Sequence, residues 1–196
     1  MKDADASGSR AVEMLSKVTT EHPDDADQRL KFVDAQVERA AELRAAGRRD
    51  VAGAQAHAAL QTAEQLLAKD PNDRMKLLAA MQARLLLASV DGDANDAKTQ
   101  REHVLQTVQA VKVGKTDPRL LALHVEALLG LDRKRDAQPL VRLLWDEGYR
   151  EPEFVSLLQR ARIDYPANSA FQSRLLAATS DTDDNAARKT ADVAHN

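Results

Sequence analysis

Five oxygen-bearing side chains between residues 91 and 102 have the spacing of a calcium-binding loop. A hard cation needs oxygen ligands at alternating positions, because the chain has to wrap around it. The sixth position of such a loop turns sharply and is normally Gly, but Asp96 stands there, and Lys98 occupies the apolar eighth position. A solvated turn between two helices explains the same residues, so we predict no metal site here. The candidate ligands are Asp91, Asp93, Asn95, Thr99 and Glu102.

The other patterns with phosphate-binding or catalytic chemistry are incomplete. Residues 113–116, Val-Gly-Lys-Thr, imitate the end of a phosphate-binding loop, but Gln109 stands where that motif needs a Gly, and the context is helical. No two of the five histidines lie four residues apart, and the chain has no cysteine to complete a metal or thiol site. No Ser/His/Asp set is marked out as nucleophile, base and orienting group. We therefore predict a protein without enzymatic activity, bound metal or cofactor.

Charge and composition argue against several classes of partner. The 196 residues include 28 basic and 31 acidic side chains, a formal net charge of −3, and only 3% are aromatic. With no strongly basic face and few rings for base stacking, the chain is not expected to bind nucleic acid. No stretch approaches the roughly 20 apolar residues that span a bilayer. The compartment stays open between the cytoplasm, for a complete chain, and the periplasm, for a fragment of a membrane signalling protein.

Apolar residues recur at the spacing of one helix face along most of the chain, and strand-type runs are absent. From Pro118 to Pro152, two apolar series separated by the polar turn 132–136 predict two antiparallel helices. Another stretch carries alanines at spacings of four, three and four, which predicts a face for close helix–helix packing. These alanines are Ala52, Ala56, Ala59 and Ala63. The sequence therefore predicts an all-α protein.

Three turns share a pattern that predicts an internal repeat. Each begins with a residue able to take the left-handed conformation that ends a helix, and each has an Ala five positions later, where a larger side chain would separate paired helices. The first positions are Gly47, Gly92 and Asp132, and the alanines are Ala52, Ala97 and Ala137. We predict a disordered N-terminus at 1–9, one helical-repeat domain at 10–179 and a disordered tail at 180–196. Its repeats span about 24–70, 72–116 and 118–151, followed by a cap at 152–179.

The helix pairs and turns between Asp24 and Pro152 resemble tetratricopeptide repeats, and the third unit has the 34-residue period of that family. The resemblance implies antiparallel helix pairs stacked as a short right-handed solenoid with a C-terminal capping helix pair. In that family the first helix of each pair lines a groove, so the resemblance implies a scaffold that binds a protein or a peptide. The groove positions that it implies are Asp34, Arg44, Gln82, Ser89, Arg119 and Glu126.

The segment from Arg142 to Phe154 is similar to the closing part of helical-repeat domains attached to some bacterial serine/threonine protein kinases and transcriptional regulators. This second resemblance implies an alternative function, the sensor or regulatory domain of a larger bacterial signalling protein. A reading frame that continues into a kinase or a membrane segment would distinguish this alternative from a free-standing binding module.

Overall fold

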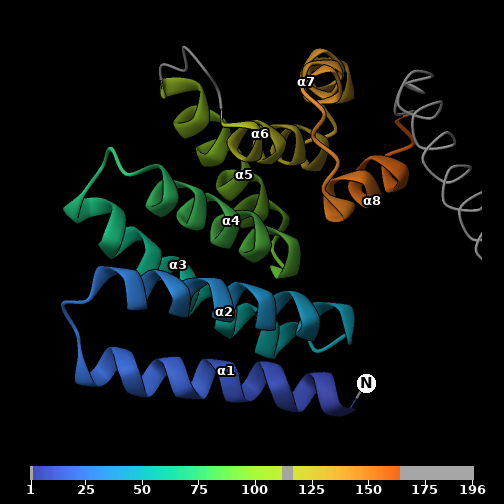
Figure 1. Cartoon of the computed structure of the whole chain (residues 1–196). Helices are drawn as coiled ribbons and strands as arrows, with labels where there is room; N and C mark the ends of the chain where they lie inside the picture. Colours follow the sequence, from blue (N-terminus) through green and yellow to red (C-terminus); the bar gives the residue numbers. More distant parts are fainter. Residues whose placement is uncertain (1, 112–116, 164–196) are drawn as a thin grey trace, which may run out of the picture.

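The computed structural model describes residues 2–111 and 117–163, and these residues form helices joined by short turns, without a strand (Figure 1). The predicted all-α class is confirmed. The helices of the described ranges are α1 (Lys2–Glu21), α2 (Ala26–Ala45), α3 (Arg49–Lys69), α4 (Arg74–Val90), α5 (Ala94–Ala110), α6 (Pro118–Gly130), α7 (Lys134–Asp146) and α8 (Pro152–Arg160).

Aspartates begin the helices that open the three predicted repeats. Asp25, Asp73 and Asp117 are the N-cap residues of α2, α4 and α6, and each carboxylate accepts a hydrogen bond from a backbone N–H two or three residues later. Such a carboxylate satisfies a donor that the helix leaves free, and its charge interacts favourably with the helix dipole. Pro118 follows the third of these caps, in the first turn of α6, where its missing N–H is not needed.

Two of the three predicted repeat turns have a left-handed backbone at their first position. The angle φ is +77° at Gly47 and +57° at Asp132. Gly92 does not take this conformation, and Asp91 before it ends α4 with ψ of 136°. The Asp91 carboxylate accepts a hydrogen bond from the backbone N–H of Asp93 at 3.0 Å. A turn built on an aspartate side chain therefore replaces the left-handed residue at this repeat.

The first helix starts earlier than the sequence analysis indicates. Residues 1–9 are predicted to be disordered, but α1 starts at Lys2 and continues to Glu21. A Cβ added to Gly8 would lie 2.6 Å from Oε2 of Glu42 and 3.2 Å from Cδ of Arg39, so α1 approaches α2 closely at this point. Tertiary packing on α2 therefore extends the helix through a polar stretch that has no apolar periodicity of its own.

The helices from α1 to α7 each pack against the next one, and α2 also contacts α4, as α4 contacts α6. One apolar cluster extends from Val33 in α2 to Leu158 in α8. The four alanines of the predicted packing face of α3 are fully buried, which confirms the close contact of this face; they are Ala52, Ala56, Ala59 and Ala63. The Ala at the fifth position after each turn start is buried as well, with exposed fractions of 0%, 6% and 0% for Ala52, Ala97 and Ala137.

The last described helix begins the predicted cap. Gly148 ends α7 with φ of +80°, and Pro152 opens α8, as the sequence indicates. Phe154 and Leu158 of this helix are buried in the main apolar cluster. The remainder of the predicted cap, 164–179, and the predicted tail, 180–196, lie outside the described residues.

Candidate functional site

The six residues implied as groove positions belong to α2, α4 and α6, the helices that contact one another in that order. We call the surface that they define the binding face. Members seven residues apart on α4 and on α6 project to the same side of their helix, because seven residues make almost two full turns. Arg44 and Arg119 are exposed, whereas Gln82, Ser89 and Glu126 are half-buried. The complete set is Asp34, Arg44, Gln82, Ser89, Arg119 and Glu126.

Arg44 and Ser89 are in direct contact, although 45 residues separate them in the sequence. Nη1 of Arg44 donates a hydrogen bond to Oγ of Ser89 at 2.8 Å. The Ser89 hydroxyl in turn donates to the backbone carbonyl oxygen of Leu86 at 2.6 Å. This chain of hydrogen bonds joins the C-terminal ends of α2 and α4 and holds the arginine at the binding face.

Glu126 is a half-buried carboxylate on α6, and charged side chains of other helices influence its pKa. Among the described residues, none lies within hydrogen-bonding or ion-pair distance of it. Burial raises the pKa of Glu126, because the protein interior disfavours the charged form. Arg44 of α2, Arg101 of α5 and Arg160 of α8 oppose this rise in pKa, while Glu153 of α8 adds to it.

Arg101 of α5 makes contacts with α4 and α6 that the sequence analysis missed. Its Nη2 donates a hydrogen bond to the backbone carbonyl oxygen of Ala88 at 3.0 Å, near the end of α4. Its side chain also lies directly against Gly130, at the end of α6, where a Cβ would collide with the guanidinium. A Gly inside an apolar helix is the one sequence signal of such a close approach, and it does not identify the partner.

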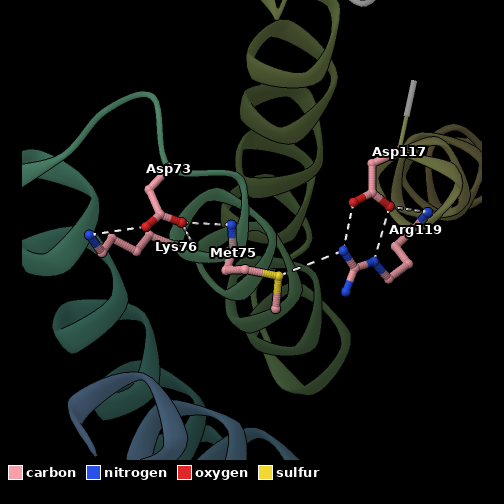
Figure 2. A network of polar contacts seen from close by, with 5 residues as sticks. All are labelled: Asp73, Met75, Lys76, Asp117 and Arg119. Carbon is pink, nitrogen blue, oxygen red and sulfur yellow. Dashed lines mark hydrogen bonds and ion pairs between the residues drawn. The ribbon is translucent and has the colours of Figure 1, made fainter. Parts of the chain in front are cut away.

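Arg119 is held by the residue that caps its own helix, as Figure 2 shows. Its Nε and Nη2 donate to the two carboxylate oxygens of Asp117 at 3.0 Å and 2.7 Å. The hydrogen bond from Arg119 is the main reason why the pKa of Asp117 lies below its usual range. Nη2 also lies 3.6 Å from Sδ of Met75 on α4, a side chain that is 44% exposed (Figure 2). The guanidinium therefore connects the N-terminal ends of α4 and α6.

A similar pair occurs at the start of α4. Nζ of Lys76 lies 3.1 Å from the carboxylate of Asp73, which caps this helix (Figure 2). It also lies 3.2 Å from the carboxylate of Asp70. The hydrogen bonds in these ion pairs raise the pKa of Lys76. The pKa of Asp73 is lowered mainly by the hydrogen bond that its carboxylate accepts from the backbone N–H of Lys76, and further by the Lys76 side chain. In both pairs, Asp117–Arg119 and Asp73–Lys76, a basic side chain binds the aspartate that caps the N-terminus of the helix.

Asp34 and Gln82 complete the binding face without a contact to its other members. Within the described ranges, neither side chain makes a hydrogen bond or an ion pair. Burial of the Asp34 carboxylate and then the nearby charge of Glu38 raise the pKa of Asp34. The structure therefore links Arg44 to Ser89, and it gives the side chains of Asp34 and Gln82 no hydrogen bond or ion pair within the described ranges.

The residues with calcium-loop spacing have structural partners. Asp93 caps α5 and accepts hydrogen bonds from the backbone N–H groups of Asn95 and Asp96. Lys98 lies 3.8 Å from the Glu102 carboxylate. No group of three potential metal-ligating side chains occurs in the part of the chain that the structure describes. The phosphate-loop-like residues 113–116 lie outside that part.

The segment similar to signalling proteins forms the junction of α7 and α8. The Arg150 guanidinium lies 3.3 Å from the centroid of the Trp145 ring, and Arg150 also donates hydrogen bonds to backbone carbonyl oxygens of Trp145 and Tyr149. The rings of Tyr149 and Phe154 meet edge to face at 5.5 Å. These contacts give the aromatic residues of the segment a structural role.

Two further observations bear on the class of the protein. Over residues 2–111 and 117–163, every helix is too short or too polar to cross a membrane. Comparisons with protein-family models, with curated proteins and with solved structures gave no match to this chain.

Proposed function

We propose that this chain is a non-catalytic scaffold that binds a protein or a peptide segment on the binding face. In this proposal the pairs α2–α3, α4–α5 and α6–α7 are antiparallel units of a tetratricopeptide-like right-handed solenoid, and α8 begins its cap. The contacts support it, because the first helices of successive pairs pack on one another, α2 on α4 and α4 on α6. Successive first helices in contact are what a groove along such an array requires.

The observation that carries the proposal is the meeting of polar groups from separate repeats on this face. Arg44 of the first unit bonds to Ser89 of the second, and its charge also acts on Glu126 of the third. The face offers guanidinium, hydroxyl, amide and carboxylate groups along three helices. An extended peptide, which presents donors, acceptors and side chains along its length, matches such a row of groups.

The test is to select peptides from a random library on the intact chain and to measure their affinity for variants. Gln82→Ala and Arg119→Gln alter the binding face on two different helices, and each is expected to weaken the selected peptides about tenfold. Lys134→Gln, an exposed change at the start of α7, serves as the control and is expected to leave the affinity within about twofold.

Peptides that lose affinity with Lys134→Gln and keep it with both face variants would contradict the proposal, since the basic turn would then be the recognition surface. Circular dichroism of each variant shows whether the helical fold is retained. A library that gives no binding peptide would also count against the proposal.

A further inference from the structure

Met75 of α4 and Arg119 of α6 meet at the N-terminal ends of their helices (Figure 2). We propose that Met75 is an oxidation site: a peroxide converts its thioether to a sulfoxide, whose oxygen binds the Arg119 guanidinium and withdraws it from a carboxylate of the partner. This inference rests on the proposed function, because Arg119 belongs to the binding face, and it adds a covalent modification that regulates this face.

Both side chains start from backbones that the helix caps hold in place. The Met75 N–H donates a hydrogen bond to the Asp73 carboxylate at 2.8 Å, and the Arg119 N–H donates to the Asp117 carboxylate at 3.0 Å. From these two helix starts the side chains approach each other until Nη2 of Arg119 lies 3.6 Å from Sδ of Met75. The sulfur atom is therefore held beside a charged hydrogen-bond donor.

Asp117 uses only part of the Arg119 guanidinium. It accepts from Nε and from one N–H of Nη2. The other N–H of Nη2 is directed to Met75, and together with Nη1 it forms the fork that binds a carboxylate through two parallel hydrogen bonds. Sulfur is a weak acceptor, so a carboxylate of the partner replaces it readily.

Oxidation turns this weak acceptor into a strong one. A lone pair on Sδ attacks one oxygen of hydrogen peroxide, the O–O bond breaks and an S–O bond forms. The sulfur loses two electrons to the peroxide, and the proton of the transferred oxygen joins the departing hydroxide to give water. The product is a methionine sulfoxide, which is polar where the thioether was apolar. At the observed separation of Sδ and Nη2, an oxygen added on the side of Arg119 lies within the roughly 2.7–3.2 Å of an N–H···O hydrogen bond.

The sulfoxide oxygen competes with the partner for the same N–H of Arg119. A hydrogen bond from a guanidinium to this oxygen is stronger than one to a thioether sulfur. Oxidation thus occupies one arm of the fork and leaves a carboxylate of the partner only the donors of Nη1. It also strengthens the link between α4 and α6, an effect on stability that needs no partner.

Exposure and contacts distinguish the three methionines of the described structure. Met75 is 44% exposed, so a peroxide reaches its sulfur, whereas Met81 is 2% exposed and is protected in the folded chain. Met14 of α1 is 68% exposed, and no hydrogen bond to its sulfur occurs among the described residues. Met14 is therefore oxidised as well, but no donor binds its oxygen.

The first experiment measures the sulfoxide contact without a partner. The intact chain is treated with hydrogen peroxide, and mass spectrometry of its proteolytic peptides is expected to show sulfoxide at Met75 and Met14 and little at Met81. Met75→Leu, treated alike, keeps the other methionines. The change in melting temperature on treatment should be about 2–4 °C more positive for the wild type than for Met75→Leu, because of the added charged hydrogen bond. Arg119→Gln should respond as Met75→Leu does.

The second experiment uses library peptides that Arg119→Gln weakens. Met75→Gln imitates the sulfoxide without peroxide, because it places an amide oxygen near the position of the sulfoxide oxygen. This variant and the oxidised wild type are each expected to bind the peptides about tenfold more weakly than the untreated wild type. Met75→Leu should bind equally before and after treatment. Met14→Gln makes the same change at the other exposed methionine and should stay within about twofold of the wild type.

Two results would overturn the inference while the scaffold stands. One is a melting shift in Arg119→Gln equal to that of the wild type, since Arg119 would then not bind the sulfoxide. The other is full peptide affinity in both the oxidised wild type and Met75→Gln. If the library instead gives no binding peptide, the proposed function fails, and the melting curves alone decide whether Arg119 binds the oxidised Met75.

Discussion

Asp117 and Glu126 are both carboxylates on or next to α6, and their pKa values shift in opposite directions. Arg119 donates two hydrogen bonds to Asp117, and this holds the pKa of Asp117 low even though its side chain is only 12% exposed. Glu126 has three arginines in its surroundings and none at bonding distance in the described structure, so burial dominates and raises its pKa. Direct contact, more than the number of nearby charges, decides which protonation state is favoured.

Replacement of Glu126 by Gln should stabilise the fold at high pH. A carboxyl group whose folded pKa exceeds its unfolded value of about 4.3 binds more protons in the folded state, so stability falls as the pH rises from the unfolded pKa through the folded one. Glu126→Gln removes this loss. Urea denaturation should show the variant more stable than the wild type by on the order of 1 kcal/mol at about pH 8, with little difference at about pH 4. An equal difference at both pH values would mean that titration of Glu126 is not the cause.

The Asp117–Arg119 pair leads to the opposite dependence. The pKa of Asp117 is lower in the folded protein than in the unfolded chain. The ionised Asp117 carboxylate therefore stabilises the fold above its unfolded pKa, and this stabilisation is lost as the pH falls through the folded pKa. Asp117→Asn keeps a capping side chain and should cost about 1 kcal/mol at neutral pH. A double-mutant cycle with Arg119→Gln checks the cause, because the two costs should not add if the pair is responsible.

At the scale of single elements, helices α2 and α4 end in two different ways: one with a left-handed glycine and one with a hydrogen bond to an aspartate side chain. Gly47 ends its helix with a left-handed backbone, with φ of +77°. Gly92 occupies the corresponding turn of the next repeat without it, because the Asp91 carboxylate makes a hydrogen bond there instead. An added Cβ would meet nothing within 4 Å at either glycine, so the two positions differ in backbone conformation and not in available space.

This difference makes the two glycines a matched pair for mutation. Gly47→Ala should cost about 1 kcal/mol, because a side chain disfavours the left-handed conformation. Gly92→Ala should change the free energy of unfolding by less than about 0.5 kcal/mol. Chemical denaturation of both variants beside the wild type provides the measurement. Equal costs for the two would indicate that the φ angle at Gly47 does not control the stability of its turn.

At the scale of the whole molecule, one apolar cluster connects the helices from α2 to α8. A smaller cluster beside it contains residues of α2, α3 and α4, among them Ala56, which has no exposed surface. Because neighbouring helices share buried side chains along the array, a change in one repeat should be felt by the others through successive interfaces.

Ala56→Leu tests both the alanine face and this coupling. The larger side chain overpacks the contact of α3 with its neighbours and should cost about 1–3 kcal/mol. Trp145, the single Trp of the chain, reports on α7, far from Ala56 in the sequence. Its fluorescence transition in urea should shift by the same amount as the far-UV circular dichroism signal. A shift in circular dichroism alone would show that the two ends unfold independently.

Local interactions explain the features that could be predicted from the sequence. The all-α class, the buried alanines of α3 and the ends of α1 and α7 follow from apolar periodicity and from Pro and Gly at helix boundaries. These patterns depend on residues within one or two helical turns of each other. The start of α1 could not be predicted in this way, since residues 2–9 have no apolar period and are helical where Gly8 allows close packing on α2.

The sequence by itself determined which segments are helices and where most of them end, because capping, turn geometry and helix amphipathicity depend on neighbouring residues. The tertiary structure alone decided which polar groups meet on the binding face. Arg44 reaches Ser89 across 45 residues, and Arg101 of α5 donates to the Ala88 carbonyl oxygen and lies against Gly130 of α6. Such meetings depend on how the helices are positioned against one another. That positioning is set by the summed packing of buried side chains, which no local pattern contains.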